Sequence, residues 1–484
     1  MPTTRGVTAR MSKERGAGAP SLGLVAAVAI VLGNMIGSGV FTLPASLAPY
    51  GGLSFAGWAV SAGGSLALAL VFARLARARP AEGGPYAYTR QAFGDLPAFL
   101  VAWGYWISVW AANAALAVAF VGYLDPFIPG IVRQPPLAAA LAIAVLWLLT
   151  GVSARGVREA GHVQVWTTAL KVLPLVAVGV AGLAVLQPAH FAVPVHGAVP
   201  IVTNTMSVVT LTLWAFLGVE CATIPAGSIH DPERTIPRAT VVGTVVAAVI
   251  YMVSTAGAMG ALAPAVLGRT PAPFAEAARV LFGDTAAQLV AIGAAISCFG
   301  ALNGWILIVG QLPMAVAEEG LFPAVFARKS RRETPVAGLT IGAVLSSLLI
   351  ASNYSRDLVS LFTFIILLAT LGTLVPYFFC SLAALMNRDG RPSAGSQDPA
   401  YRSEPATDVG RVFGPGEDAT SVGRVVGPGE RRRGQTIVAA LAFGYSLVAI
   451  AGAGETVLLL GAAALIAGLP VYAWVRRGAG APAA

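Results

Sequence analysis

Long apolar runs recur along the whole chain and constrain its fold more than any other feature. Of the 484 residues, 56% are hydrophobic and only 11% are charged. A run of about 18 or more apolar residues can cross the roughly 30 Å hydrocarbon core of a bilayer as one helix. Strand-like alternation is absent, so the sequence predicts an all-α membrane protein and not a barrel. Twelve spans are predicted, at about 22–46, 53–76, 97–123, 137–153, 163–187, 203–225, 239–263, 285–312, 336–353, 357–387, 436–453 and 455–475.

The basic residues are distributed unevenly among the segments that join these runs. With the N-terminus placed in the cytoplasm, 26 of the 31 Lys and Arg residues fall on the cytoplasmic side and four on the outer side. The remaining one, Lys171, lies inside a span. This bias predicts an even number of spans, with both termini in the cytoplasm. The protein is expected to lie in the inner (cytoplasmic) membrane. The net charge of +9 therefore reflects membrane topology, and no nucleic-acid partner is expected.

Composition divides the chain into five regions. Residues 1–21 are a predicted cytoplasmic tail that lacks the pattern of a cleaved signal peptide. Residues 22–387 hold the first ten spans and are the predicted core. Residues 388–434 are rich in Gly, Pro, Ser and charge, and they repeat VGRVFGPGE as VGRVVGPGE. Such a segment buries too little apolar surface to fold, so it is a predicted disordered cytoplasmic loop. Spans 11 and 12 occupy 435–475, and 476–484 form a second cytoplasmic tail.

Two spans contain poor helix formers at a similar depth. The first carries VLGNMIGSGVFTLP at 31–44, with Gly37, Ser38 and Gly39 in its middle. The sixth carries TLTLWAFLGVECATIPAG, which includes Gly218 and Glu220. Paired interruptions in corresponding helices are typical of transporters built from inverted repeats, with a binding site at the midplane. Spans 1–5 and 6–10 would then be the two repeats. Close packing of small residues is the alternative explanation.

An interrupted membrane helix exposes backbone groups that need polar partners. Amides at the start of a half-helix attract a carboxylate, and carbonyls at the end of another accept from an ammonium group. We therefore predict that Gly37 and Gly39 expose the backbone to a small zwitterion. Ser38 would add a hydroxyl, and Asn34 would brace the break.

Two ionisable residues are predicted to lie inside spans, where such groups are costly and usually functional. Glu220 is interpreted either as a functional acid or as a structural partner of Lys171 or of nearby amides. Lys171 either donates to the carbonyls of the broken helix or carries a proton during turnover. The sequence leaves these alternatives open.

Several aromatic residues are candidates for the wall of a pocket. Trp214 lies beside the second break and Trp305 lies in span 8, and tryptophan at mid-span is unusual. Its ring favours contact with cations. In span 3, Tyr105, Val109 and Asn113 follow i, i+4, i+8 and share one helix face. That face lines either a cavity or a packed neighbour.

No motif for nucleotide or metal chemistry accompanies these features. The chain has no GxxxxGK[ST] segment, and its four histidines are scattered without the spacing of metal ligands. We therefore expect no cofactor, no metal and no catalytic residue, which argues against an enzyme. A channel or a receptor is a further alternative, and saturable counterflow would separate a transporter from both.

The chain closely resembles the amino acid–polyamine–organocation superfamily. The motifs that carry this resemblance are GNMIGSGVFTLPASLAPYGG, GGPYAYTRQAFG, LWAFLGVECATIPAGSIHDPERTIPRAT, LNGWILIVGQ, EEGLFPAVFARKSRRETPVAGL and TLVPY. They extend over about residues 22–387. Within the superfamily the chain is most similar to the basic amino acid/polyamine antiporters, in particular those that exchange arginine for agmatine.

The resemblance implies a twelve-helix, five-plus-five inverted-repeat (LeuT-like) fold with discontinuous helices 1 and 6, often dimeric. It implies exchange, by alternating access, of a cationic, arginine-like amino acid for its decarboxylated amine or another amino acid. By similarity, the residues that bind substrate would be Asn34, Ile36, Gly37, Ser38, Gly39, Ser108, Asn113, Trp214, Leu217 and Trp305. The gating residues would be Tyr105, Glu220 and Tyr377, and Lys171 is a further candidate for a proton-linked residue.

The chain departs in three respects from the pattern of the arginine/agmatine antiporters. Ser108-Val109 and Ala369 stand where that pattern has an alanine-cysteine pair and a serine near the guanidinium end of the pocket. Lys171 instead resembles a lysine of proton-coupled permeases in the same superfamily. The alternative implied by Lys171 is a proton-coupled symporter of broader or neutral amino acids.

Overall fold

The computed structural model describes residues 23–78, 84–155, 161–193, 198–219, 232–331, 334–352, 357–386 and 428–479. These residues form helices and connecting segments, with no strand among them, so the predicted all-α class is confirmed. In chain order the elements are α2 (Leu24–Met35), α3 (Ser38–Leu47), η1 (Ala48–Tyr50), α4 (Leu53–Ala78), α5 (Pro85–Phe93), α6 (Asp95–Gly122), η2 (Ile131–Arg133), α7 (Pro135–Ala154), α8 (Gly161–Ala184), η3 (Pro188–Phe191), α9 (Ala198–Phe216), α10 (Pro232–Ala261), α11 (Pro264–Leu267), α12 (Pro273–Phe282), α13 (Asp284–Glu318), α14 (Val336–Ser352), α15 (Leu358–Met386), α16 (Pro428–Ala451), α17 (Glu455–Ile466) and α18 (Gly468–Ala479).

The helices are those of a multi-pass membrane protein. In the described part of the chain, ten helices are long and apolar enough to cross a membrane. Two shorter apolar helices cover Lys171–Ala184 and Val336–Ser352. The number of twelve spans therefore stays a prediction.

The predicted cytoplasmic loop is only partly covered by the structure. Residues 388–427 lie outside the described residues, as does the tail 1–21. Helix α16 begins at Pro428, so the predicted boundary at residue 434 falls inside a helix. Proline suits the first helical position, because its missing N–H would have no intrahelical partner there.

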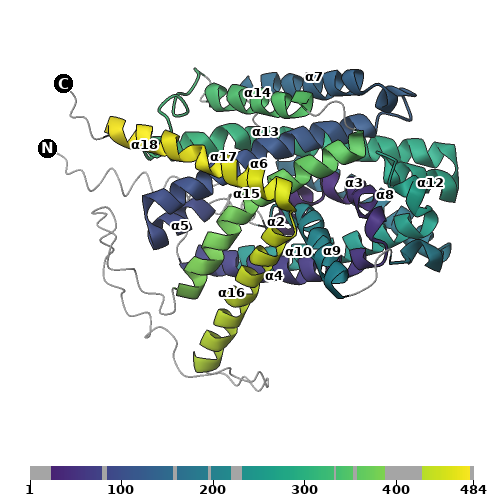
Figure 1. Ribbon diagram of the computed structural model, residues 1–484, viewed down its shortest axis with the longest axis horizontal. Helices are drawn as coiled ribbons and strands as arrows, with labels where there is room; N and C mark the ends of the chain where they lie inside the picture. The colour runs from purple at the N-terminus through teal and green to yellow at the C-terminus, as the bar shows by residue number, and fades with distance from the viewer. Residues whose placement is uncertain are drawn as a thin grey trace.

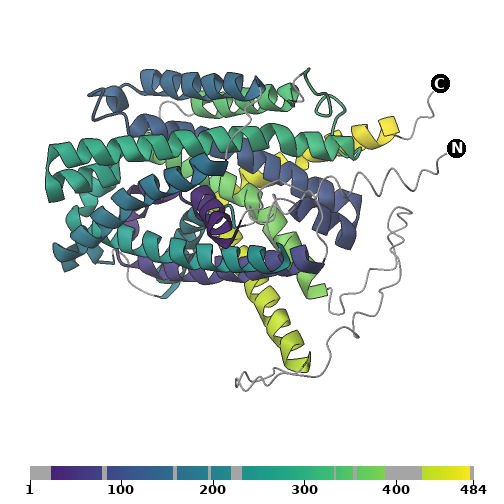
Figure 2. The same ribbon diagram turned by 180° about the vertical axis from the view of Figure 1, so that it is seen from behind.

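Helix α6 forms the centre of the bundle. The most apolar stretch of α6 is 89% buried within the protein. The most apolar stretch of the segment Glu455–Arg477, which covers α17 and part of α18, is only 17% buried. Neighbouring helices α7, α13, α14 and α15 all contact α6, and α7 and α14 lie side by side along one edge of the bundle (Figure 1, Figure 2). The sequence of α6 permits this because small side chains let helices approach closely from several sides. These are Ala111, Ala112, Ala114, Ala115, Ala117 and Ala119, all of them buried.

Two short helices mark the opposite ends of the bundle. Helix α5 lies at one end of the long axis together with α18, and α12 lies at the other (Figure 1). We refer to these as the α5 end and the α12 end. Each short helix is followed at once by a long one, α6 after α5 and α13 after α12.

Helices α8 and α10 are in direct backbone contact. A Cβ atom on Gly257 of α10 would overlap the carbonyl oxygen of Gly179 on α8, and one on Gly182 would overlap the backbone of Gly257. Only glycine allows so close an approach. Both helices also contact α2, so this pairing helps to position the first half of the interrupted span.

We predict that Gly257→Ala destabilises the protein by about 1–3 kcal/mol, because the added methyl group forces α8 and α10 apart. The thermal midpoint of the purified protein in detergent measures the effect. Gly300→Ala on α13 is the matched control, since a Cβ there meets nothing within 4 Å. Equal midpoints for the two variants would contradict the contact.

Candidate functional site

The first spanning segment is interrupted where the sequence predicts. Helix α2 ends at Met35 and α3 begins at Ser38, leaving Ile36 and Gly37 between them. Gly37 has φ −119° and ψ −136°, which is not a helical conformation. The Ile36 N–H still donates to the Leu32 carbonyl at 2.8 Å. The chain therefore leaves one half-helix and enters another within two residues.

The end of α9 lies against the start of α3. Helix α9 ends at Phe216, and Gly218 has a φ of 106°. A Cβ atom on Gly39 would lie 2.9 Å from Cδ1 of Trp214 and 3.1 Å from the Ala215 Cα. Residues 220–231, which include Glu220, lie outside the described residues. The continuation of this span and the role of Glu220 stay predictions.

A cavity of about 30 Å³ lies between the two interruptions. The first span contributes Met35, Gly37, Ser38 and Gly39 to its wall. The other lining residues come from α6, α9 with the segment after it, and α13; they are Ser108, Ala112, Leu116, Trp214, Leu217, Ala301 and Trp305. The cavity thus brings together seven of the ten residues predicted to bind substrate.

The other three predicted binding residues do not line this cavity. Ile36 is fully buried within the break. Asn113 is buried on α6, and its Oδ1 atom has no hydrogen-bond partner among the described residues. The side chain of Asn34 lies outside the described part of the structure.

The face of α6 that lines the cavity differs from the face that carries Tyr105, Val109 and Asn113, and the two are offset by one residue along the helix. Ser108, Ala112 and Leu116 line it with the spacing i, i+4, i+8, whereas Tyr105 and Asn113 do not. One residue corresponds to a rotation of about 100° around the helix. Of the two interpretations given for the face with Tyr105 and Asn113, packing against neighbouring helices therefore fits this conformation better than lining a cavity.

The wall formed by α6 is tied to α15. The hydroxyl groups of Ser108 and Thr373 share a hydrogen bond. Ser108 therefore lines the cavity and also joins α6 to α15. Tyr377, a predicted gating residue on α15, is fully buried, and its ring lies 5.5 Å from that of Phe72. It does not line the cavity.

Lys171 lies at the broken end of α2. Its side chain is buried, and Nζ is 3.5 Å from the carbonyl oxygen of Gly33. Carbonyls in the last turn of a helix lack intrahelical partners. The ammonium group can therefore donate to the end of α2, beside the cavity but not in its wall.

The cavity has the chemistry to hold a molecule that carries both charges. Ser38 and Gly39 form the first turn of α3, where free N–H groups and the helix dipole favour an anion. The Ser38 Oγ is buried and has no partner among the described residues. The rings of Trp214 and Trp305 provide faces that attract a cation. No carboxylate lines the cavity in the described part of the chain.

The present size of the cavity is too small for an amino acid. About 10–15 Å³ holds one water molecule, so 30 Å³ holds two or three. An amino acid would therefore fit in this cavity only if its walls moved apart.

The comparison with known proteins identifies the family. The model of the amino acid permease family matches residues 22–453. The chain belongs to this family. This permease is therefore a member of the amino acid–polyamine–organocation superfamily, and that prediction is confirmed.

Its relatives are named as transporters. A cadaverine/lysine antiporter of Escherichia coli strain K12 is 34% identical over 373 residues, which cover 75% of this permease and 82% of the relative. A putative arginine/ornithine antiporter of Bacillus subtilis strain 168 is 34% identical over 388 residues, or 74% and 82% of the two chains. The putrescine transporter PotE of Haemophilus influenzae is 33% identical over 371 residues, or 75% and 83%. These names agree with the predicted resemblance to basic amino acid/polyamine antiporters.

We predict that Gly39→Ala weakens substrate binding strongly while the protein stays folded, because its methyl group would push into Trp214 and the α9 backbone. Equilibrium binding of labelled lysine to purified protein measures the effect. Gly300→Ala on α13 is the control, since a Cβ there meets nothing within 4 Å and Gly300 does not line the cavity. Equal losses in both variants would argue against a specific contact between α3 and α9.

Proposed function

We propose that this permease exchanges a cationic amino acid for the corresponding amine by alternating access. The observation that carries the proposal is the cavity between the α2–α3 break and the end of α9, lined by Ser38, Trp214 and Trp305. The names of three relatives, which include lysine, cadaverine, arginine, ornithine and putrescine transporters, support the substrate class.

The contacts of substrate follow from the local chemistry. The carboxylate would accept hydrogen bonds from the first N–H groups of α3 and from the Ser38 hydroxyl. The α-ammonium would donate to carbonyls near Ile36, Trp214 and Leu217. The cationic side chain would lie against the Trp305 ring. An amine lacks the carboxylate, so the α3 contacts would distinguish the two exchanged substrates.

The remaining topology belongs to this proposal. Twelve spans in two inverted repeats, both termini in the cytoplasm and a homodimer are what the sequence predicts. The asymmetry of basic residues supports an orientation with the α5 end in the cytoplasm, because Arg90, Arg328 and Arg476 belong to that side of the predicted topology.

The direct test is uptake of labelled lysine, arginine or ornithine into proteoliposomes. Vesicles would be loaded with cadaverine, agmatine or putrescine, with an unlabelled amino acid, or with nothing. We expect saturable uptake only where the lumen holds a substrate. Uptake that never saturates would identify a channel instead.

We predict that Trp305→Ala weakens cationic substrates by about 1–2 kcal/mol more than neutral ones, since a desolvated cation–π contact is lost. Competition of each amino acid for labelled substrate gives both affinities. Trp305→Phe is the control, because it keeps an aromatic face of smaller size. If Trp305→Ala costs both substrate classes equally, the ring is only a packing surface.

The second candidate function is proton-coupled symport, and the position of Lys171 favours it. A buried ammonium beside the Gly33 carbonyl can lose and regain its proton as the broken helix moves. Uptake into empty vesicles, driven by an inward proton gradient, would then occur and would be abolished in Lys171→Met. If Lys171 is structural, empty vesicles take up nothing in either protein.

A further inference from the structure

A second, larger cavity lies on the predicted outer side of the membrane. Its volume is about 540 Å³, which is usual for a small-molecule site, whereas the cavity beside the α2–α3 break has about 30 Å³. We call the larger one the outer cavity and the smaller one the central cavity. The end of α3 with η1, α9, the start of α15, Gly268 and the segment between α16 and α17 line the outer cavity. No described residue lines both cavities.

The outer cavity is lined by hydroxyl groups whose hydrogens are already donated elsewhere. Thr363 donates to the Val359 carbonyl at 2.8 Å. The 2.7 Å contact between Ser46 and Thr363 therefore uses the hydrogen of Ser46. A hydroxyl group has one hydrogen to donate and two lone pairs that accept. Both oxygens therefore keep lone pairs, but no hydrogen, for a further partner.

The other hydroxyl groups of this wall follow the same pattern. Ser207 donates to the Thr203 carbonyl at 3.2 Å, and Tyr50 hydrogen-bonds to Ser207. Ser360 hydrogen-bonds to Asp357, whose ionised carboxylate can only accept. All five hydroxyl groups in the described wall therefore offer lone pairs to a ligand.

Two acids lie at the mouth of the outer cavity. Asp357 directly precedes α15 and accepts from the Ser360 N–H at 3.0 Å, and Glu455 follows Gly454 of the wall as the first residue of α17. Burial raises the pKa of Asp357, but hydrogen bonds from Ser360 and from backbone N–H groups lower it below its ordinary value overall. Asp357 is therefore ionised at neutral pH. One exposed base, Arg269, borders the wall, and the described lining itself holds no lysine or arginine.

The backbone adds to the negative potential of the outer cavity. Ala45 and Ser46 lie in the last turn of α3, and Gly452 and Ala453 directly follow the end of α16. The carboxyl end of a helix carries a partial negative charge. Helices α15 and α17 present their positive amino ends here, but each begins beside one of the two acids. The cavity therefore favours a cation.

We propose that the outer cavity binds an aliphatic amine such as cadaverine or putrescine, at a site separate from the central cavity. A primary ammonium group has three donors and no acceptor, which matches a wall of lone pairs. The two acids at the mouth supply the opposite charge, and Leu211, Phe364 and Leu367 supply apolar surface for the methylene chain. The choice of amines as ligands rests on the proposed function, to which this inference adds a second site.

The two cavities would select differently between an amine and its amino acid. The central cavity offers the first N–H groups of α3 to a carboxylate. The outer cavity has no spare donor among its described hydroxyl groups, and its lone pairs and acids repel a carboxylate. Cadaverine should therefore bind in both cavities, and lysine, which differs from it by the carboxylate, only in the central one.

The test counts bound molecules on the purified protein in nanodiscs of phosphatidylcholine and phosphatidylglycerol. Equilibrium dialysis with labelled cadaverine or labelled lysine gives the number bound per protein. We expect two cadaverine molecules and one lysine. A parallel set of discs contains phosphatidylethanolamine, because its headgroup carries the same ammonium group as the ligand. We expect the cadaverine count to be the same in both sets.

Substitutions then assign the second molecule to the outer cavity. Gly39→Ala should leave one cadaverine and no lysine, and Ala301→Trp, which fills the central cavity, replaces it if its thermal midpoint is lowered. On that background Asp357→Asn, which keeps a cap on α15, should weaken cadaverine binding about two- to fivefold. Ser360→Trp should abolish it by filling the outer cavity. Asp284→Asn is the matched control, an acid at the start of α13 outside the cavity wall, and should change nothing.

Each outcome decides one question. Loss of all cadaverine binding in both Gly39→Ala and Ala301→Trp overturns the outer site, as does residual binding that Asp357→Asn and Ser360→Trp leave unchanged. Equal residual binding of lysine and cadaverine also overturns it, because the lone pairs would then not select the ligand. Loss of the second cadaverine in discs with phosphatidylethanolamine assigns the cavity to a lipid headgroup and overturns the proposal.

The same experiment separates this site from the proposed exchange. If the residual cadaverine binding behaves as expected but the unmodified protein shows no exchange in vesicles, the proposed exchange fails while the outer site stands.

Discussion

A helix interrupted inside a membrane must find polar partners for its free backbone groups within the protein, because lipid supplies none. The other helices are arranged around that requirement at the α2–α3 break. Lys171 of α8 reaches the Gly33 carbonyl, and α9 comes so close to Gly39 that no side chain fits there. The backbone contact between α8 and α10 then fixes the helix that carries Lys171. The groups left over are the first N–H groups of α3 and the Ser38 hydroxyl, which face the cavity.

The same constraint explains why the proposed site would use tryptophan rings, and no carboxylate among the described residues, to hold a cation. An acid placed in the wall would bind a cation but would be costly to bury when the cavity is empty. Tryptophan faces carry no such cost, because they pack as apolar surface in the absence of substrate. Trp214 and Trp305 therefore let the cavity contract to about 30 Å³ between substrates.

The sequence was most informative where one physical property decides the structure. Apolar length predicts the spans, and glycines beside polar residues predict the break at Gly37, because both are local properties. The rotation of α6 about its axis was not predictable, because α6 is apolar on nearly every side and no polar stripe fixes its orientation. Ala112 and Leu116, and likewise Met35 and Ala301, carry no chemical sign of lining a cavity. Trp305 and Ser38 do carry such a sign, and both line it.

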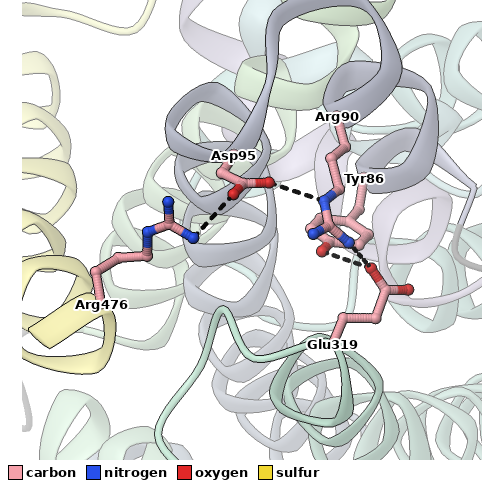
Figure 3. A network of polar contacts seen from close by, with 5 residues as sticks. All are labelled: Tyr86, Arg90, Asp95, Glu319 and Arg476. Atoms are coloured by element: carbon pink, nitrogen blue, oxygen red, sulfur yellow. Dashed lines mark hydrogen bonds and ion pairs between the residues drawn. The ribbon is translucent and has the colours of Figure 1, made fainter. Parts of the chain in front are cut away.

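The two copies of R-x-x-F-G-D, at 90–95 and 279–284, show that one short motif can have different partners in the fold. R-x-x-F-G-D can be read from the sequence twice, and each copy makes the same internal ion pair. The second nitrogens of Arg90 and Arg279 nevertheless have different partners, because Arg90 binds Glu319, more than 100 residues away, and Arg279 binds Glu276 on its own helix. Arg90 thereby joins α5 to the residue after α13 (Figure 3), whereas the acidic partners of Arg279 among the described residues lie in the segment around α12. These partners depend on how the helices pack against one another, so the motif alone could not predict them.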